Sequence, residues 1–157
     1  MNIPETKHFR VEEFLHPGIF AYCKYAKGDI WRWYVSDFQI KYAILLRELT
    51  DAPLYLNDWH RGGRLIGRGT RPQYYLPKGG AKFSQHYFAR ALDCASSKYD
   101  PVELAGIIQD NFPRFAAIGL TTIENPRFTK TWLHGDCRQQ IDGVHKPGQL
   151  LIVGGAL

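Results

Sequence analysis

A long segment rich in glycine and arginine, residues 60–83, most constrains what this chain can fold into. Its sequence, HRGGRLIGRGTRPQYYLPKGGAKF, predicts a connection between regular elements. A connection of this length inside a compact domain is unusual and often functional. The segment has no acidic residue, and its basic residues are Arg61, Arg64, Arg68, Arg71, Lys78 and Lys82. The alternative interpretation is a flexible, solvated insertion.

The clearest helix precedes this segment, over residues 36–50. Ser36 is a suitable N-cap for it. Apolar side chains recur there at helical spacing, namely Phe38, Tyr42, Leu45 and Leu49. Residues 1–33 are expected to be irregular with short helical pieces, and residues 53–59, PLYLNDW, are predicted to form a strand.

Short strands and one capped helix are predicted after the segment. Residues 91–95, ALDCA, have the composition of a buried strand. In the sequence DPVELAGIIQDNF, Asp100 can cap a helix, Pro101 suits its first position, and Glu103 completes a capping box. Further strands are predicted within AAIGLTTI, TWLHGDC and QLLIVGG.

The order of these elements predicts one α+β domain over residues 1–157. A chain of 157 residues can form one domain with a real core and is too short for two comfortable ones. Helices precede or separate the strands, and most strands follow hairpin-length connections. We therefore expect a central antiparallel sheet with helices packed on one side.

The charge balance favours an anionic partner without choosing one. The net charge of +5 suits nucleic acid, anionic lipid or an anionic wall polymer, and it equally suits solubility alone. The arginine-rich segment with Tyr74 and Tyr75 could grip single-stranded nucleic acid. No recognition motif supports that reading, so we expect no nucleic-acid partner.

Cysteine usage and hydropathy predict a reduced protein without a membrane span. An odd, sparse set of cysteines, Cys23, Cys94 and Cys137, argues against a disulfide framework. The first residues contain no apolar run typical of a signal peptide, and no stretch approaches about 20 apolar residues. We expect a monomer that is synthesised in the cytoplasm and needs another exit route to act outside.

Two short stretches carry the candidate chemistry. SQHYFARALD places His86 and Asp93 seven positions apart, and TWLHGDCR contains His134 and Asp136. Alternate residues of a strand share a face, so Trp132, His134 and Asp136 are predicted to point one way. Spacing alone leaves open that the histidines and aspartates are structural.

His86, Asp93 and His134 together would suit a catalytic zinc site. Two imidazoles and one carboxylate give three protein ligands and leave a fourth position open for water. Zinc lowers the pKa of a bound water to roughly 7. A nearby carboxylate can then take and return a proton, and a cation can stabilise a developing oxyanion.

These stretches resemble the motifs of peptidase family M15, the zinc D-Ala-D-Ala carboxypeptidases and peptidoglycan endopeptidases. SQHYFARALD resembles the family's S-x-H-x-x-G-x-A-x-D motif, and WLHGDCR resembles its H-x-D-x-R motif. HFRVEEF, PLYLNDWHRGGR and GGAKFSQH resemble three further segments of the family. The five matches occur in the family's order, between residues 9 and 138.

The resemblance implies a fold, a cofactor and residue roles. The fold is the small α+β domain of the hedgehog and DD-peptidase type, with one zinc ion. His86, Asp93 and His134 match the zinc ligands. Arg61 matches an arginine that contacts the scissile carbonyl or a substrate carboxylate, and Ser84 matches a serine at the substrate-binding edge.

The sequence also departs from the family pattern. Ala89 replaces the glycine of the first motif, which is a mild change if φ is negative there. The assignment of Arg61 depends on that arginine alone, because the turn before it differs. Thr131 stands where several members carry a catalytic glutamate. Asp136 is then the first candidate for the general base, and Glu124 is the second.

The resemblance therefore implies a zinc-dependent peptidase that hydrolyses a peptide bond of peptidoglycan stem peptides or cross-links. Its size favours a phage lysis enzyme or a tail-associated enzyme that acts on the cell wall. The alternative is a catalytically inactive zinc-binding module in a phage particle or in wall binding. The changed glutamate motivates this alternative.

Overall fold

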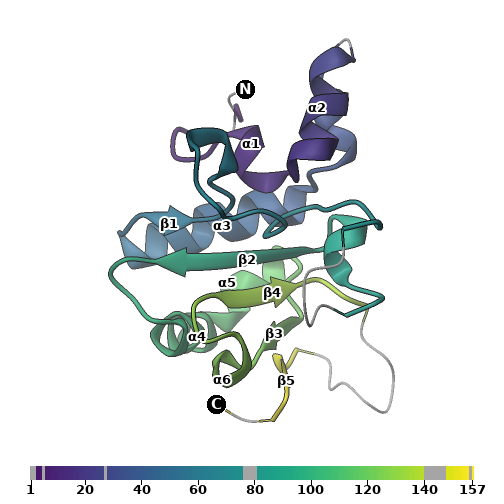
Figure 1. Ribbon diagram of the computed structural model, residues 1–157. Coiled ribbons are helices and arrows are strands. Elements are labelled where there is room, and N and C mark those ends of the chain that lie inside the picture. The colour runs from purple at the N-terminus through teal and green to yellow at the C-terminus, as the bar shows by residue number, and fades with distance from the viewer. Residues whose placement is uncertain (1–2, 5, 27, 76–80, 140–147, 156) are drawn as a thin grey trace.

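Five strands form one mixed, mostly antiparallel sheet through the middle of the computed structural model (Figure 1). The structure describes residues 3–4, 6–26, 28–75, 81–139, 148–155 and 157. The strand order is β1-β2-β4-β3-β5, and β3 and β5 pair in parallel. The predicted α+β class is confirmed, with a mixed rather than wholly antiparallel sheet. The strands are β1 Leu54–Tyr55, β2 Ala91–Ser96, β3 Thr122–Glu124, β4 Leu133–Asp136 and β5 Leu151–Val153.

Helices pack against this sheet and extend beyond it toward the amino terminus (Figure 1). The α-helices are α1 Val11–Phe14, α2 Pro17–Tyr25, α3 Asp37–Thr50, α4 Pro101–Asp110, α5 Phe112–Ala117 and α6 Pro126–Thr129. The 3₁₀ helices are η1 Ile30–Trp33, η2 Trp59–Arg61 and η3 Gln85–Phe88. Helix α3 contacts β2, and α4 contacts β4. Among the described helices, none is both long and apolar enough for a membrane span.

Helix α3 ties the core to the start of β2. Ser36 caps it as predicted, because its Oγ accepts from the Gln39 N–H at 3.3 Å. The Gln39 side chain is fully buried and donates from Nε2 to the Ala91 carbonyl oxygen at 2.8 Å and to Thr70 Oγ1 at 3.2 Å. One helix therefore holds both β2 and the arginine-rich segment in place.

The second predicted helix is also confirmed, and the region after it is partly different. Asp100 caps α4 and forms the capping box with Glu103. Pro113 then lies in the first turn of α5, where the missing N–H of proline costs nothing. Residues 112–117 are therefore helical, and the strand predicted within residues 116–123 begins only at Thr122. The strand predicted over residues 53–59 is likewise reduced to β1.

The described part of segment 60–83 is anchored along β2, so it is not a free solvated insertion. The Thr70 N–H donates to the Phe14 carbonyl oxygen at 2.7 Å, and the Asp93 N–H donates to the Arg68 carbonyl oxygen at 2.8 Å. A Cβ at Gly69 would lie 2.0 Å from the Phe14 carbonyl oxygen, so the backbone approach requires glycine. Lys78 lies outside the described residues.

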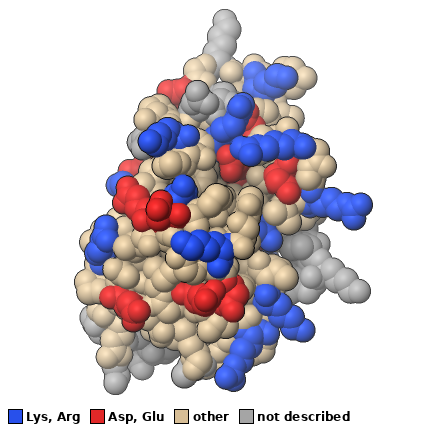
Figure 2. Space-filling model, turned by 90° about the vertical axis from the view of Figure 1, so that its left-hand side faces the viewer, with Lys and Arg blue, Asp and Glu red and all other residues tan. Residues whose placement is uncertain are grey.

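The described surface charges are mixed on one face, and the cysteines form no disulfide. On the face shown in Figure 2, acidic and basic side chains are interspersed, so that face offers no patch of a single sign to a polyanion. Cys23, Cys94 and Cys137 are free, in agreement with the expected absence of a disulfide framework.

Candidate metal centre

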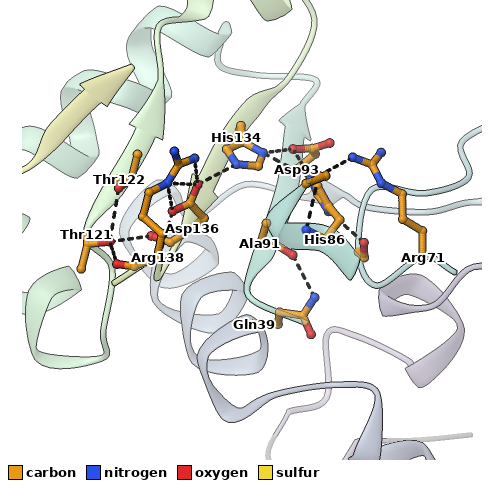
Figure 3. A network of polar contacts seen from close by, with 12 residues as sticks. Gln39, Arg71, His86, Ala91, Asp93, Thr121, Thr122, His134, Asp136 and Arg138 are labelled. Atoms are coloured by element: carbon orange, nitrogen blue, oxygen red, sulfur yellow. Dashed lines mark hydrogen bonds and ion pairs between the residues drawn. The ribbon is translucent and has the colours of Figure 1, made fainter. Parts of the chain in front are cut away.

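Three predicted ligands converge on one point of the sheet surface (Figure 3). Asp93 of β2 and His134 of β4 are partners in the antiparallel register, and η3 brings His86 to them. The Nδ1 atom of His134 lies 2.7 Å from Asp93 Oδ1. The Nε2 atom of His86 lies 3.3 Å from both of these atoms. Two neighbouring strands and one helical turn thus supply a compact group of three ligand atoms.

Strand alternation explains why these side chains share one face. Leu92 and Cys94, the neighbours of Asp93, are fully buried in the hydrophobic core on the opposite face. Gly135 follows His134, and a Cβ there would lie 2.7 Å from the Tyr42 ring. The glycine therefore lets β4 lie close to α3 while His134 points to the metal group.

The outer nitrogen of each histidine is held by an acceptor. His86 Nδ1 lies 2.8 Å from the Gly69 carbonyl oxygen, and His134 Nε2 lies 3.0 Å from Asp136 Oδ2. Because a carbonyl oxygen can only accept, His86 carries its proton on Nδ1 and presents the Nε2 lone pair inward. Asp136 favours the equivalent state of His134. Such outer contacts are typical of histidines that bind metal.

The resulting inner group needs a positive charge. Two nitrogen lone pairs and the Asp93 carboxylate would otherwise face one another within 3.3 Å. A four-coordinate zinc ion with bonds of 2.0–2.1 Å separates its ligand atoms by about 3.3 Å. Two of the three separations have this value, and the 2.7 Å separation of His134 and Asp93 needs to open by only ~0.6 Å. The three residues could therefore hold a metal ion.

In the absence of metal, a proton takes the place of the cation. Burial lowers the pKa of His134, but its hydrogen bonds to Asp136 and Asp93 outweigh burial and raise this pKa to about 10. Burial raises the pKa of Asp93, yet its interactions with His86 and His134 hold the net pKa well below the usual range. The imidazolium of His134 can then donate to a carboxylate on either side.

Asp136 lies behind His134 and away from the open side of the metal group. Its side chain is fully buried. Oδ1 accepts from the Arg138 N–H at 3.1 Å and from Nε at 2.9 Å, and Oδ2 accepts from His134 and from Arg138 Nη2. Burial raises the pKa of Asp136, but Arg138 and His134 lower it to about 2. This placement suits an anion that orients His134, and the predicted base role of Asp136 has no open path to a substrate.

A cleft of about 740 Å³ opens over the metal group. Glu124, the second candidate for the base, lines it together with His86, Asp93 and His134. The rest of the lining is rich in arginine and aromatic residues, notably Arg64, Arg68, Arg71, Arg138, Tyr75, Phe83, Phe128 and Trp132. Among the described lining residues, Glu124 is the only carboxylate besides the ligand Asp93.

The structure does not bring Arg61 to this cleft. Its side chain is 67% exposed, and it lines a separate cavity of about 240 Å³. There its Nη2 lies 3.5 Å from Glu13 Oε1, and its Nε donates to His60 Nε2 at 3.1 Å. Arg61 therefore does not lie beside the metal group, where the role implied by the resemblance would require it.

Arg71 occupies the place expected for Arg61. It is buried in the cleft wall, where Nη2 donates to Ser84 Oγ at 2.8 Å and Nη1 donates to the Gly67 carbonyl oxygen at 3.2 Å. Its Nε has no hydrogen-bond partner among the described residues. The resemblance singled out Arg61 and not Arg71, and an irregular segment has no periodicity that assigns a direction to each side chain.

Ser84 lines the cleft and also caps η3. Ala89 ends η3 with φ of 55°, in the left-handed region that favours glycine. The change from glycine to alanine would be mild only with a negative φ, and that condition is not met at Ala89. A hydrogen bond of 2.6 Å from Ser36 Oγ to the Ala89 carbonyl oxygen holds this conformation.

No protein-family model, curated protein sequence or solved structure matches this chain. Function is therefore inferred from the geometry of the metal group and its cleft, together with the motifs in the sequence.

Proposed function

We propose that this protein is a zinc-dependent peptidase that hydrolyses peptide bonds of peptidoglycan. The observation that carries the proposal is the convergence of His86 Nε2, Asp93 Oδ1 and His134 Nδ1 within 3.3 Å at an open cleft. Three ligands of this kind with an open side are typical of catalytic zinc. A bound zinc ion supplies an activated water molecule and a Lewis acid.

The residues around the metal group divide the remaining work. Glu124 lines the same cleft as the ligands, so it is our candidate for the general base that takes a proton from the attacking water. Arg71 lines the cleft with a buried guanidinium, and its positive charge suits an oxyanion or a terminal carboxylate of the substrate. Asp136 orients His134 through its Nε2.

The chemistry of the cleft supports a peptidoglycan peptide as substrate. Arginines outnumber carboxylates in the lining, and stem peptides of the cell wall carry several free carboxylates. The motifs in the sequence independently point to this substrate class. We propose that the protein reaches the wall after release by a phage, as a lysis enzyme or a tail-associated enzyme, and acts as a monomer.

Mass spectrometry of muropeptides tests the proposal. Purified peptidoglycan is incubated with zinc-loaded protein, with chelator-treated protein and with the Asp93→Ala variant. We expect new cleaved muropeptides only with the zinc-loaded parent. Stoichiometric zinc without any change in any muropeptide would refute the peptidase and favour a zinc-binding module that serves a phage particle or wall binding.

A further inference from the structure

Arg68 is a half-buried cation beside the metal ligand Asp93. Its carbonyl oxygen accepts the Asp93 N–H at 2.8 Å, so the two residues lie on adjacent backbone segments. Its guanidinium carbon lies 5.8 Å from the centroid of the Trp132 ring, and Nη1 donates to the Tyr55 carbonyl oxygen at 3.3 Å. Both Arg68 and Trp132 line the metal cleft.

Arg68 makes no ion pair with any described carboxylate, although the nearby charge of Asp93 favours its charged form. In the same cleft, Arg138 pairs with Asp136. Among the described lining residues, Arg71 is the other arginine that is withdrawn from water without a carboxylate partner, and its guanidinium lies beside Ser84. Cations withdrawn from water are costly unless an anion accompanies them. Two such arginines from different parts of the cleft wall match a ligand with two separate anionic groups.

We propose that Arg68, held over Trp132, selects substrates in which the residue near the scissile bond carries an additional carboxylate on its side chain. This inference rests on the proposed peptidase function. In peptidoglycan, diaminopimelate has the lysine side chain with a carboxylate added to its terminal carbon. Its added carboxylate can accept two hydrogen bonds from the planar guanidinium fork. The lone ammonium of lysine would instead be repelled by the arginines of the cleft.

The test compares two synthetic stem peptides that differ only in diaminopimelate or lysine at the third residue. For the zinc-loaded parent, we expect kcat/KM to favour the diaminopimelate peptide by about 10- to 100-fold, the range of one hydrogen-bonded charge pair. In Arg68→Gln this preference falls below about threefold, through loss on the diaminopimelate peptide alone. Arg68→Lys keeps the charge and retains part of the preference, which guards against a variant that folds poorly.

The control is Arg90→Gln, which removes the same charge from an exposed arginine outside the cleft lining and should keep the parent preference. Equal kcat/KM for the two peptides in the parent, or an equal loss on both peptides in Arg68→Gln, would overturn the role of Arg68. If neither peptide is cleaved, the peptidase proposal fails instead. Calorimetric binding of the same two peptides then decides on Arg68 by the same preference.

Discussion

His134 and Asp93 face each other across neighbouring antiparallel strands, with Nδ1 and Oδ1 2.7 Å apart. The opposite nitrogen of the same imidazole contacts Asp136 at 3.0 Å. His134 therefore lies between two carboxylates, of which one faces the cleft and the other is fully buried. This arrangement separates a metal-binding role from a positioning role and leads to distinct expectations for each residue.

Asp136→Asn should weaken zinc binding by about 10- to 100-fold, because Asp136 fixes the orientation and the tautomer of His134. Competition with a chromophoric chelator measures this affinity, and the substitution Asp110→Asn, at an exposed position of α4, is the matched control. The contrary outcome is unchanged zinc affinity together with lost hydrolysis at full zinc loading, which would restore Asp136 as the base.

Zinc binding should release about one proton from His134 at pH 7.5. The imidazole is protonated in the metal-free protein because its pKa is raised to about 10, and it must be neutral to bind the ion. Below pH 10 the apparent affinity should therefore rise about tenfold per pH unit from this residue. Calorimetry in phosphate and in Tris measures the released proton, and a binding enthalpy that is equal in both buffers would refute it.

The same raised pKa predicts how metal-free protein responds to alkali. A group whose pKa is higher in the folded state stabilises the fold below its unfolded pKa, and that contribution is lost as pH rises through the folded value. The metal-free protein should therefore lose the stabilisation that His134 contributes as pH rises from about 6.5 to about 10. Urea unfolding at several pH values checks this, and the Tm of zinc-loaded protein should lack the same loss.

Glu124→Gln should lower kcat by about 100-fold or more while zinc affinity stays unchanged, because a general base contributes 10²- to 10⁴-fold. The glutamine keeps the size of the side chain but cannot take a proton. The control is Glu48→Gln, at an exposed position of α3. Exposed Glu103 on α4 is unsuitable because it belongs to a capping box. Full activity of Glu124→Gln would remove this residue from the mechanism.

Ala89→Gly should stabilise the protein by about 1 kcal/mol, because alanine pays a steric penalty in the left-handed region that glycine avoids. The observed φ of 55° places Ala89 in that region. The same substitution at exposed Ala116, inside α5, should instead destabilise by roughly 0.5–1 kcal/mol. Chemical unfolding of both variants gives the comparison, and a loss of stability in Ala89→Gly would contradict the backbone argument.

The parts of the site that follow a regular period could be predicted from sequence. Strand alternation places Asp93 and His134 on one face while Leu92 enters the core, and local capping rules place α3 and α4. Alternation also places Asp136 on the same face of the strand as His134. It does not predict how deeply each side chain on that face is buried. The burial of Asp136 beneath Arg138 therefore needed the structure.

The position of Arg71 is a second feature that the sequence could not predict. Its direction depends on the path of an irregular segment that is anchored by contacts with residues far away in the sequence, such as the bond between Thr70 and Phe14. No local pattern encodes such contacts. The strand prediction within residues 116–123 was wrong at its start for a related reason. Residues 116 and 117 complete helix α5, which begins beside Pro113.

Gly69 connects the metal group to the beginning of the chain. Its carbonyl oxygen holds His86 Nδ1 at 2.8 Å, and its Cα leaves no room for a side chain against the carbonyl oxygen of Phe14 in α1. The next residue, Thr70, donates its N–H to that same oxygen at 2.7 Å. Helix α1 and the imidazole of His86 are therefore held by the same short backbone segment, Gly69 and Thr70. We expect undocking of α1 to loosen His86, so the dissociation rate of a zinc ion bound there should report how firmly α1 is packed.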